Sequence, residues 1–178
     1  KEIDMAVHSM KDMPSYLPEG LKFAHSPRRE DPRDALIFRE GYKTLEDLPQ
    51  GAKIGTGSKR RKYQLLKHRP DLEIVPIRGN IETRIKKIET ENLDGVVLAA
   101  SGLRRAGLEE KIDYYIPTDI MLPAPAQGIL ALEIREDDKE TEKIIDSIKD
   151  NITKVQIDAE RGFLIGVNGS CHIPMGAY

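Results

Sequence analysis

The 178-residue sequence contains one cysteine, Cys171, and no long apolar run. A single cysteine cannot form an intramolecular disulfide, so we expect a reducing, cytoplasmic compartment. Because a membrane-spanning helix needs about 20 apolar residues, we expect no membrane association. The formal net charge of -2 argues against a nucleic-acid binder, whose affinity comes largely from a basic surface.

The histidines are scattered and Cys171-His172 is a lone adjacent pair, so we expect no metal site.

Hydrophobic residues make up 39% of the chain and charged residues 33%, which is typical of a folded enzyme or binding module. The chain opens on Lys1, inside a segment that resembles a strand, and without an initiator Met, so we expect that an N-terminal portion is missing. This strand is expected over residues 3–7, and Pro14 closes the segment after it, because proline cannot donate a ladder hydrogen bond. Lys11 and Asp12 therefore follow the end of a strand.

Three short apolar runs are each followed by a segment of helical character, an alternation that predicts βαβ units and parallel strands. The expected strands are 52–55, 73–77 and 95–99, and the expected helices are 59–69, 81–91 and 101–106. Ser58, Asn80 and Ser101 are expected N-caps, because their side-chain oxygens can accept from unpaired N–H groups of a first helical turn. The linkers before these helices then lie at the carboxyl ends of the strands, where open parallel sheets bind ligands.

The two ends of this central region carry turn-forming, charged or proline-rich segments, which suit exposed or inter-domain crossovers. These segments are 28–33 and 123–128. After the second of them we expect a buried strand over 129–134, an amphipathic helix over 138–150 and a last helix over 153–167.

Positive charge is concentrated in the central region. Between Lys53 and Arg105, 13 Lys and Arg residues stand against 6 Asp and Glu residues, an excess of seven positive charges that the near-neutral total conceals. The planar guanidinium group of arginine can make two parallel hydrogen bonds to a carboxylate or phosphate. Several arginines near the linkers therefore indicate a ligand with several anionic groups. The alternative is that they form solvated helix faces paired with acidic neighbours. The arginines concerned are Arg60, Arg61, Arg78, Arg84 and Arg105.

Other candidate chemistry is sparse. The segment 55–59 lacks the full spacing of a phosphate-binding P-loop. Cys171 beside His172 could be a thiol nucleophile, but adjacent residues seldom form a catalytic pair, and a lone cysteine is more often buried and structural. Asp12, taken alone, is more often a turn or N-cap carboxylate than a catalyst.

Seven segments resemble, in the same order, motifs of the porphobilinogen deaminase (hydroxymethylbilane synthase) family. They are 8–14 (HSMKDMP), 29–35 (REDPRDA), 55–61 (GTGSKRR), 78–84 (RGNIETR), 122–128 (LPAPAQG), 159–161 (AER) and 169–174 (GSCHIP). The resemblance covers essentially the whole chain, and the collinear order separates it from the chance match of one motif. It departs from the usual family pattern at Gly57, Lys59, Ala126, Ser170 and His172.

The resemblance implies an α/β fold of periplasmic-binding-protein-like domains with mixed, mainly parallel sheets, plus the start of a small α+β third domain. Residues 1–28 and 129–149 would belong to domain 1, whose N-terminal portion is missing, and 33–123 to domain 2. Residues 151–178 would start domain 3, whose remainder is missing. The active site would lie in the cleft between the first two domains.

In function, the resemblance implies a cytoplasmic transferase of tetrapyrrole (porphyrin and haem) biosynthesis, monomeric at full length. It would condense four porphobilinogen units head to tail into hydroxymethylbilane and release ammonia; whether the 178-residue chain is active by itself is left open. Asp12 would be catalytic, and Cys171 would hold a covalent dipyrromethane cofactor through a thioether. Lys11, Ser58, Arg60, Arg61 and Arg84 would bind this cofactor. The substrate-binding residues would be Arg78, Gly79, Asn80, Arg105 and Gln127.

Two other functions are compatible with parts of the sequence. A non-catalytic anion-binding receptor would share the fold and the arginines but would need neither Asp12 nor Cys171 in these roles. A regulatory or scaffolding fragment would carry no small molecule at all.

Overall fold

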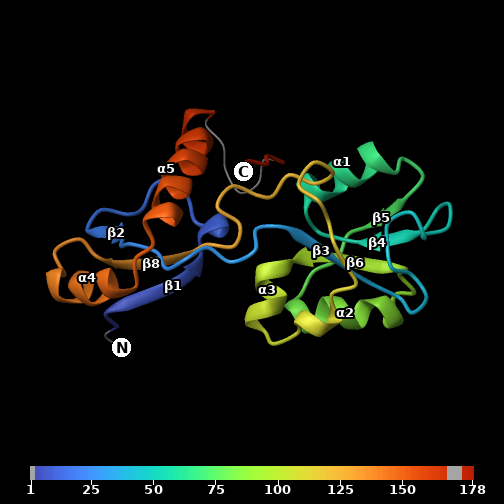
Figure 1. Ribbon diagram of the computed structural model, residues 1–178, viewed down its shortest axis with the longest axis horizontal. Helices are drawn as coiled ribbons and strands as arrows, with labels where there is room; N and C mark the ends of the chain where they lie inside the picture. Colours follow the sequence, from blue (N-terminus) through green and yellow to red (C-terminus); the bar gives the residue numbers. More distant parts are fainter. Residues whose placement is uncertain (1–2, 168–173) are drawn as a thin grey trace. The chain divides into compact units, whose positions relative to one another are not determined.

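The computed structural model describes residues 3–167 and 174–178. The chain forms two compact units, one made of Lys1–Pro32 with Ala124–Tyr178 and one made of Arg33–Pro123 (Figure 1). The second unit covers the range expected for domain 2, and the division into domains that the resemblance implies stays a prediction. Residues 151–178 group with the first unit, and a third domain that starts there stays a prediction.

The sheet of the first unit is antiparallel, with strand order β1-β8-β2. Its strands are β1 (Met5–Ser9), β2 (Leu21–Phe23) and β8 (Leu130–Arg135). A short 3-10 turn, η1 (Met10–Asp12), follows β1 directly. Alternate residues of β8 face opposite sides of the sheet. Ala131 therefore packs in a cluster that includes Ile157, whereas Leu132 packs against Ile145.

Three helical segments complete the first unit: α4 (Lys139–Ile145), η3 (Asp146–Ile148) and α5 (Asn151–Gly166). The helix expected over 138–150 is thus split, since α4 ends at Ile145 and a 3-10 turn replaces its last part. The last helix begins at Asn151, two residues earlier than expected, because the Asp150 carboxylate accepts from the Thr153 N–H at 2.7 Å and caps it.

The sheet of the second unit is mixed, with strand order β5-β4-β6-β3-β7. Its strands are β3 (Asp34–Phe38), β4 (Lys53–Gly55), β5 (Glu73–Val75), β6 (Gly95–Ala99) and β7 (Tyr114–Tyr115). Pairing is parallel between β5, β4 and β6 and antiparallel between β6, β3 and β7.

The expected mixed sheets are therefore present, but parallel pairing is confined to three strands and antiparallel pairs are more numerous. The reason is that parallel neighbours need a crossover connection. Helices α1 (Lys59–His68) and α2 (Ile81–Thr90) supply such connections between β4, β5 and β6. Strands β2, β3 and β7 were not predicted. β2 and β7 are only three and two residues long, and the apolar residues of β3 follow one another without alternation.

Helices cover both faces of this sheet (Figure 1). Leu36 of β3 packs in one core cluster with Leu65 of α1. The next residue, Ile37, packs in the other cluster with Ile88 of α2 and Leu103 of α3 (Ala100–Arg105). The alternation along β3 divides its side chains between the two layers, which explains why all five of its residues are buried.

Two of the three predicted N-caps are confirmed. The Asn80 side chain accepts from Thr83 N at 2.8 Å, and Ser58 Oγ accepts a longer bond from Arg61 N at 3.4 Å. The Ser101 prediction is wrong. Helix α3 already begins at Ala100, whose N–H donates to the Arg33 carbonyl at 3.1 Å, so β6 runs straight into the helix and Ser101 lies inside it.

Candidate functional site

Two loops that precede helices lie in direct contact at the carboxyl ends of β4 and β5. Thr56 N donates to the Val75 carbonyl at 2.9 Å. A Cβ atom on Gly57 would lie only 2.6 Å from the Ile77 carbonyl oxygen, so a side chain at this position would require the two loops to move apart. This close approach fixes the loop that presents Ser58 and the first turn of α1.

Arg60 and Arg61, expected to contact a ligand, are buried in the second unit against Asp34. Arg60 Nη2 donates to Asp34 Oδ2 at 2.7 Å. Arg61 Nε donates to the other carboxylate oxygen, Asp34 Oδ1, at 3.0 Å, and Arg61 Nη2 lies 2.8 Å from the same oxygen. Their remaining donors meet backbone oxygens: Arg60 Nη1 that of Leu122 at 2.6 Å, and Arg61 Nη1 that of Val97 at 3.1 Å. Asp34 is fully buried and both arginine side chains are at most 7% exposed.

This Asp34 cluster carries two guanidinium charges on one carboxylate. Burial is the largest cause that lowers the pKa of Arg60, the charge of Arg61 lowers it further, and Asp34 raises it. A buried cation is costly unless it is paired. The cluster therefore favours an additional anion nearby, although its geometry also serves the packing of β3, β6 and α1.

The loop before α2 and the start of that helix hold four of the predicted residues. Gly79 has a φ of +125°, a conformation that favours glycine, and its carbonyl accepts from Arg84 Nε at 2.7 Å. Asn80 caps α2, as described above. Arg78 is exposed, and no hydrogen bond or ion pair links it to any residue in the described part of the chain. Its exposed guanidinium is available to a ligand.

Arg105 closes α3 and is exposed on the surface of the same unit. The structure thus brings Arg78, Gly79 and Asn80 of the loop together with Arg84 of α2, whereas Arg60 and Arg61 form a separate, buried group.

In the first unit, Lys11 and Gln127 lie together. Lys11 Nζ donates to Gln127 Oε1 at 3.3 Å, and Gln127 Nε2 donates to the Pro32 carbonyl at 2.6 Å. Gln127 is fully buried. Asp12, the last residue of η1, is exposed, and within residues 3–167 and 174–178 no hydrogen bond or ion pair engages its carboxylate. The turn that carries it is anchored, because Met10 N donates to the Ile129 carbonyl at 2.9 Å.

The segment that carries Gln127 is held by a buried ion pair that the sequence analysis did not identify. Arg29 binds Glu160 of α5 through two parallel bonds, Nη1 to Oε1 at 2.5 Å and Nη2 to Oε2 at 3.1 Å. Arg29 Nε also donates to the Gln127 carbonyl at 2.9 Å, and Ala126 N donates to Glu160 at 2.6 Å. Residues 28–33 were expected to form an exposed or an inter-domain crossover. Exposure does not hold for Arg29, whose side chain is 6% exposed, whereas the segment does contain the boundary between the two units.

Ala126, noted as a departure from the usual glycine, has a φ of +59°, a left-handed conformation that is unfavourable for alanine. The bond from its N–H to Glu160 helps to hold this conformation.

Sequence reasoning also missed Asp34 as the partner of Arg60 and Arg61. One signal was available: Asp34 stands immediately before the apolar run 35–38, and a carboxylate that enters a buried strand needs a cationic partner. The identity of that partner is not readable from the sequence, because the two arginines lie 26 and 27 residues away.

Cys171, Ser170 and His172 lie outside the described residues, so the cofactor attachment is left as a prediction. Among the residues that are described, no group of three or more His, Cys, Asp and Glu side chains could hold a metal ion. The same residues include no helix with the length and apolar character that crossing a membrane requires.

Comparison with known proteins agrees with the family resemblance. Residues 1–143 match the family model described as porphobilinogen deaminase, dipyromethane cofactor binding domain. The porphobilinogen deaminase of Clostridioides difficile is 70% identical over 177 residues, which are 99% of this chain and 59% of that protein. That of Clostridium novyi is 62% identical and is covered to 60%. The chain thus spans somewhat over half the length of these curated relatives.

Similar solved structures include two small-molecule-binding proteins. The methionine-binding protein MetQ is 11% identical over 80% of this chain and 66% of that chain, with a TM-score of 0.49. An arginine-specific periplasmic binding protein of Salmonella typhimurium is 18% identical over 92% and 71%, with a TM-score of 0.43. These likenesses are too weak to argue from. The family model and the two relatives, by contrast, match most or all of the chain, which therefore belongs to the porphobilinogen deaminase family.

Proposed function

We propose that the chain provides the cofactor- and substrate-binding part of a porphobilinogen deaminase. The enzyme would join four porphobilinogen units head to tail into hydroxymethylbilane and release ammonia. The observation that carries the proposal is the Asp34 cluster, in which two buried guanidiniums share one carboxylate, in the same unit as the exposed Arg78. Each porphobilinogen ring carries an acetate and a propionate arm, so a growing chain of rings supplies the anions that this surplus of positive charge favours.

The dipyrromethane cofactor fits the same residues, because two linked rings present four carboxylates to a cation-rich loop edge. We propose that Ser58, Arg60, Arg61, Arg84 and Lys11 hold it and that Cys171 anchors it through a thioether. When bound, it supplies the primer to which substrate rings are added.

Arg78 in the loop before α2 and Arg105 at the end of α3 would orient the substrate. Arg78 and Arg105 would bind carboxylate arms through paired N–H donors, while Gly79 and Asn80 shape the loop and Gln127 orients Lys11. Because Arg78 is exposed, its contribution would appear mainly in the affinity for porphobilinogen.

Asp12 would be the catalytic residue. Its carboxylate can accept from a pyrrole N–H and stabilise the positive charge that develops as ammonia leaves the substrate. Exposure at the end of an anchored turn suits this role, since the group is held in place and is accessible. The observation that supports it is the absence of a competing partner for Asp12 within the described chain.

We further propose that the full-length enzyme is a cytoplasmic monomer that binds neither nucleic acid nor membranes. The single cysteine, the net charge of -2 and the lack of a long apolar run support this proposal.

The test places this chain in the context of a full-length relative. The 177 matched residues of the Clostridioides difficile protein are exchanged for those of this chain, and the chimera is supplied with porphobilinogen. We expect hydroxymethylbilane formation, and an intact mass that exceeds the polypeptide mass by two pyrrole units. A folded chimera that forms no product and carries no adduct would refute the proposal.

Three variants of the chimera assign the roles. Cys171→Ala should remove the mass adduct. Asp12→Ala should abolish turnover and leave the circular dichroism spectrum unchanged, whereas Asp137→Ala, a change at another exposed aspartate, should leave turnover intact. Arg78→Gln should raise KM more than it lowers kcat. Retained turnover in Asp12→Ala would remove that residue from catalysis.

A further inference from the structure

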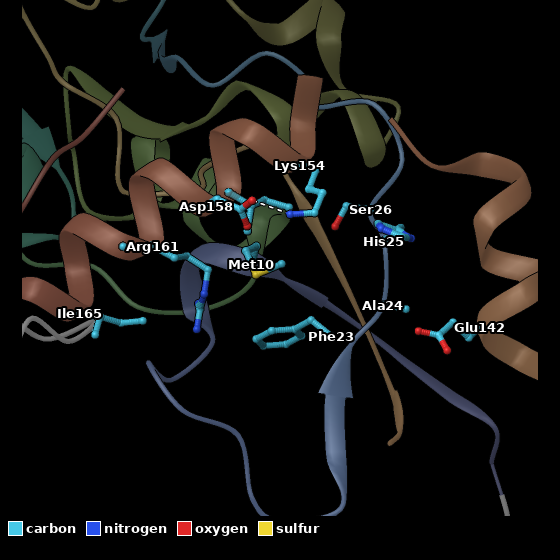
Figure 2. A pocket seen from close by; sticks show the side chains of 12 residues that line it. Met10, Phe23, Ala24, His25, Ser26, Glu142, Lys154, Asp158, Arg161 and Ile165 are labelled. Atoms are coloured by element: carbon cyan, nitrogen blue, oxygen red, sulfur yellow. Dashed lines mark hydrogen bonds and ion pairs between the residues drawn. The ribbon is translucent and has the colours of Figure 1, made fainter. Parts of the chain in front are cut away.

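The first unit contains a cavity that none of the proposed active-site residues lines. It has a volume of about 470 Å³ and lies between α5 and the segment that contains β2 (Figure 2). Apolar side chains make up much of its wall, including Met10, Phe23, Ile157 and Ile165. Small-molecule sites are typically concave, largely apolar and of about 300–1,000 Å³, so the size and lining suit a small organic ligand.

One buried cation belongs to this wall. Arg161 of α5 is only 8% exposed. Its Nη2 donates to the carbonyls of Pro14 and Ser15 at 2.6 and 3.1 Å, and its guanidinium carbon lies 5.1 Å from the centre of the Phe23 ring. Figure 2 shows the two side chains reaching toward each other from α5 and β2. Among the described residues, no carboxylate forms an ion pair with Arg161.

The other charged groups around the cavity are already paired. Lys154 Nζ lies 2.5 Å from Asp158 Oδ2. Glu142 Oε1 lies 2.6 Å from Nζ of Lys22, a residue that does not line the cavity. His25 is engaged by the Asp146 carboxylate at 2.6 Å.

Arg161 is therefore the one charged group of the described lining without a counter-charge. Burial lowers the pKa of its guanidinium, but arginine stays protonated in proteins. A buried positive charge without a paired carboxylate favours one negative charge beside it.

We propose that this cavity binds a small organic monocarboxylate, with its carboxylate on Arg161 and its apolar or aromatic body against Phe23 and Ile157. One uncompensated positive charge matches one negative charge, and the apolar wall matches an apolar body. The lining belongs entirely to the first unit and includes none of the residues that the proposed function assigns to polycarboxylates, so the site does not depend on that function.

The test uses phenylacetate and its neutral analogue phenylacetamide as probes, with the 178-residue chain observed by ¹H–¹⁵N correlation NMR. We expect phenylacetate to shift the amide signals of Phe23, Ser26 and Gly162 in a saturable manner. Phenylacetamide should bind at least about tenfold more weakly, because it offers no charge to Arg161. Equal affinity for the two probes would overturn the carboxylate assignment. Absence of saturable shifts up to about 10 mM phenylacetate would overturn the site.

Two glycines of α5 provide matched variants. Gly162 lines the cavity and Gly166 does not, and a Cβ atom added at either position meets nothing within 4 Å. Gly162→Leu should fill the cavity and weaken phenylacetate binding at least about tenfold, while Gly166→Leu should leave binding unchanged; both remove a helix-weakening glycine. Equal binding by both variants would place the ligand elsewhere.

Inorganic sulfate distinguishes a bare anion site from the proposed one. Sulfate should compete only weakly with phenylacetate, since it has no apolar body to bury. Binding of sulfate as tight as that of phenylacetate would overturn the proposed role of the apolar wall.

Discussion

Replacing Asp34 with asparagine tests whether Arg60 and Arg61 depend on one carboxylate. Removing one member of a buried ion pair costs about 3–5 kcal/mol, because an uncompensated charge is left behind. Here a single substitution removes the counter-charge of two guanidiniums that are 6% and 7% exposed, and the new amide group turns a donor toward other donors. We therefore expect a loss of about 5 kcal/mol, which is comparable to the whole stability of a marginal domain.

The loss is measured by urea denaturation, combined with hydrogen exchange of peptides from β3 and β6 to separate the second unit from the first. The control is Glu91→Gln, which breaks the more exposed Lys87–Glu91 pair on α2 and should cost less than about 1 kcal/mol. A loss below about 2 kcal/mol in Asp34→Asn would show that the guanidiniums do not rely on the carboxylate. The idea of a buried cationic surplus that attracts substrate carboxylates would then fail.

Three further substitutions test other parts of the structure. Glu160→Gln should cost about 3–5 kcal/mol in urea denaturation, because it leaves the buried Arg29 charge unpaired. A hydrogen bond from the Arg69 side chain is the main cause that lowers the pKa of Asp71 from 3.8. The contribution of ionised Asp71 to the stability of the fold is therefore complete above about pH 4, and it is lost as the pH falls through the lowered pKa. Thermal denaturation between pH 7 and pH 2 should accordingly show a shallower acid loss in Asp71→Asn. Gly128→Ala should cost more than about 2 kcal/mol in thermal denaturation, since φ is +91° and the new Cβ would lie 2.4 Å from a backbone oxygen.

Each of these predictions has a control variant or an outcome that would contradict it. The double variant Arg29→Met with Glu160→Leu should recover most of the stability that Glu160→Gln loses, because apolar side chains can replace a buried pair; no recovery would contradict the charge argument. An unchanged acid slope in Asp71→Asn would remove Asp71 from the acid response. Gly20 has a similar φ of +83° but open space around the Cβ position. If Gly20→Ala cost as much stability as Gly128→Ala, the collision of the new Cβ with backbone would not be the cause of the loss.

Much of the second unit was predictable from nearby residues. The strand over 95–99 and the helices that begin at residues 59 and 81 appear as expected, because apolar runs, turn residues and the caps Ser58 and Asn80 act within a few positions along the chain. The same local signals placed the cationic loop residues at the carboxyl ends of the parallel strands.

Local signals failed wherever a residue's role depends on a distant partner. Asp34 meets Arg60 and Arg61 only after β3 has paired with β6, and Arg29 meets Glu160 across 131 residues of sequence. Both sites contain charges that the sequence presents as surface groups, and both become buried pairs because strands and helices far apart in the chain pack together. Burial and charge pairing arise from packing over long sequence separations, so only the tertiary structure decided which arginines are held inside the protein and which, like Arg78, remain available to a ligand.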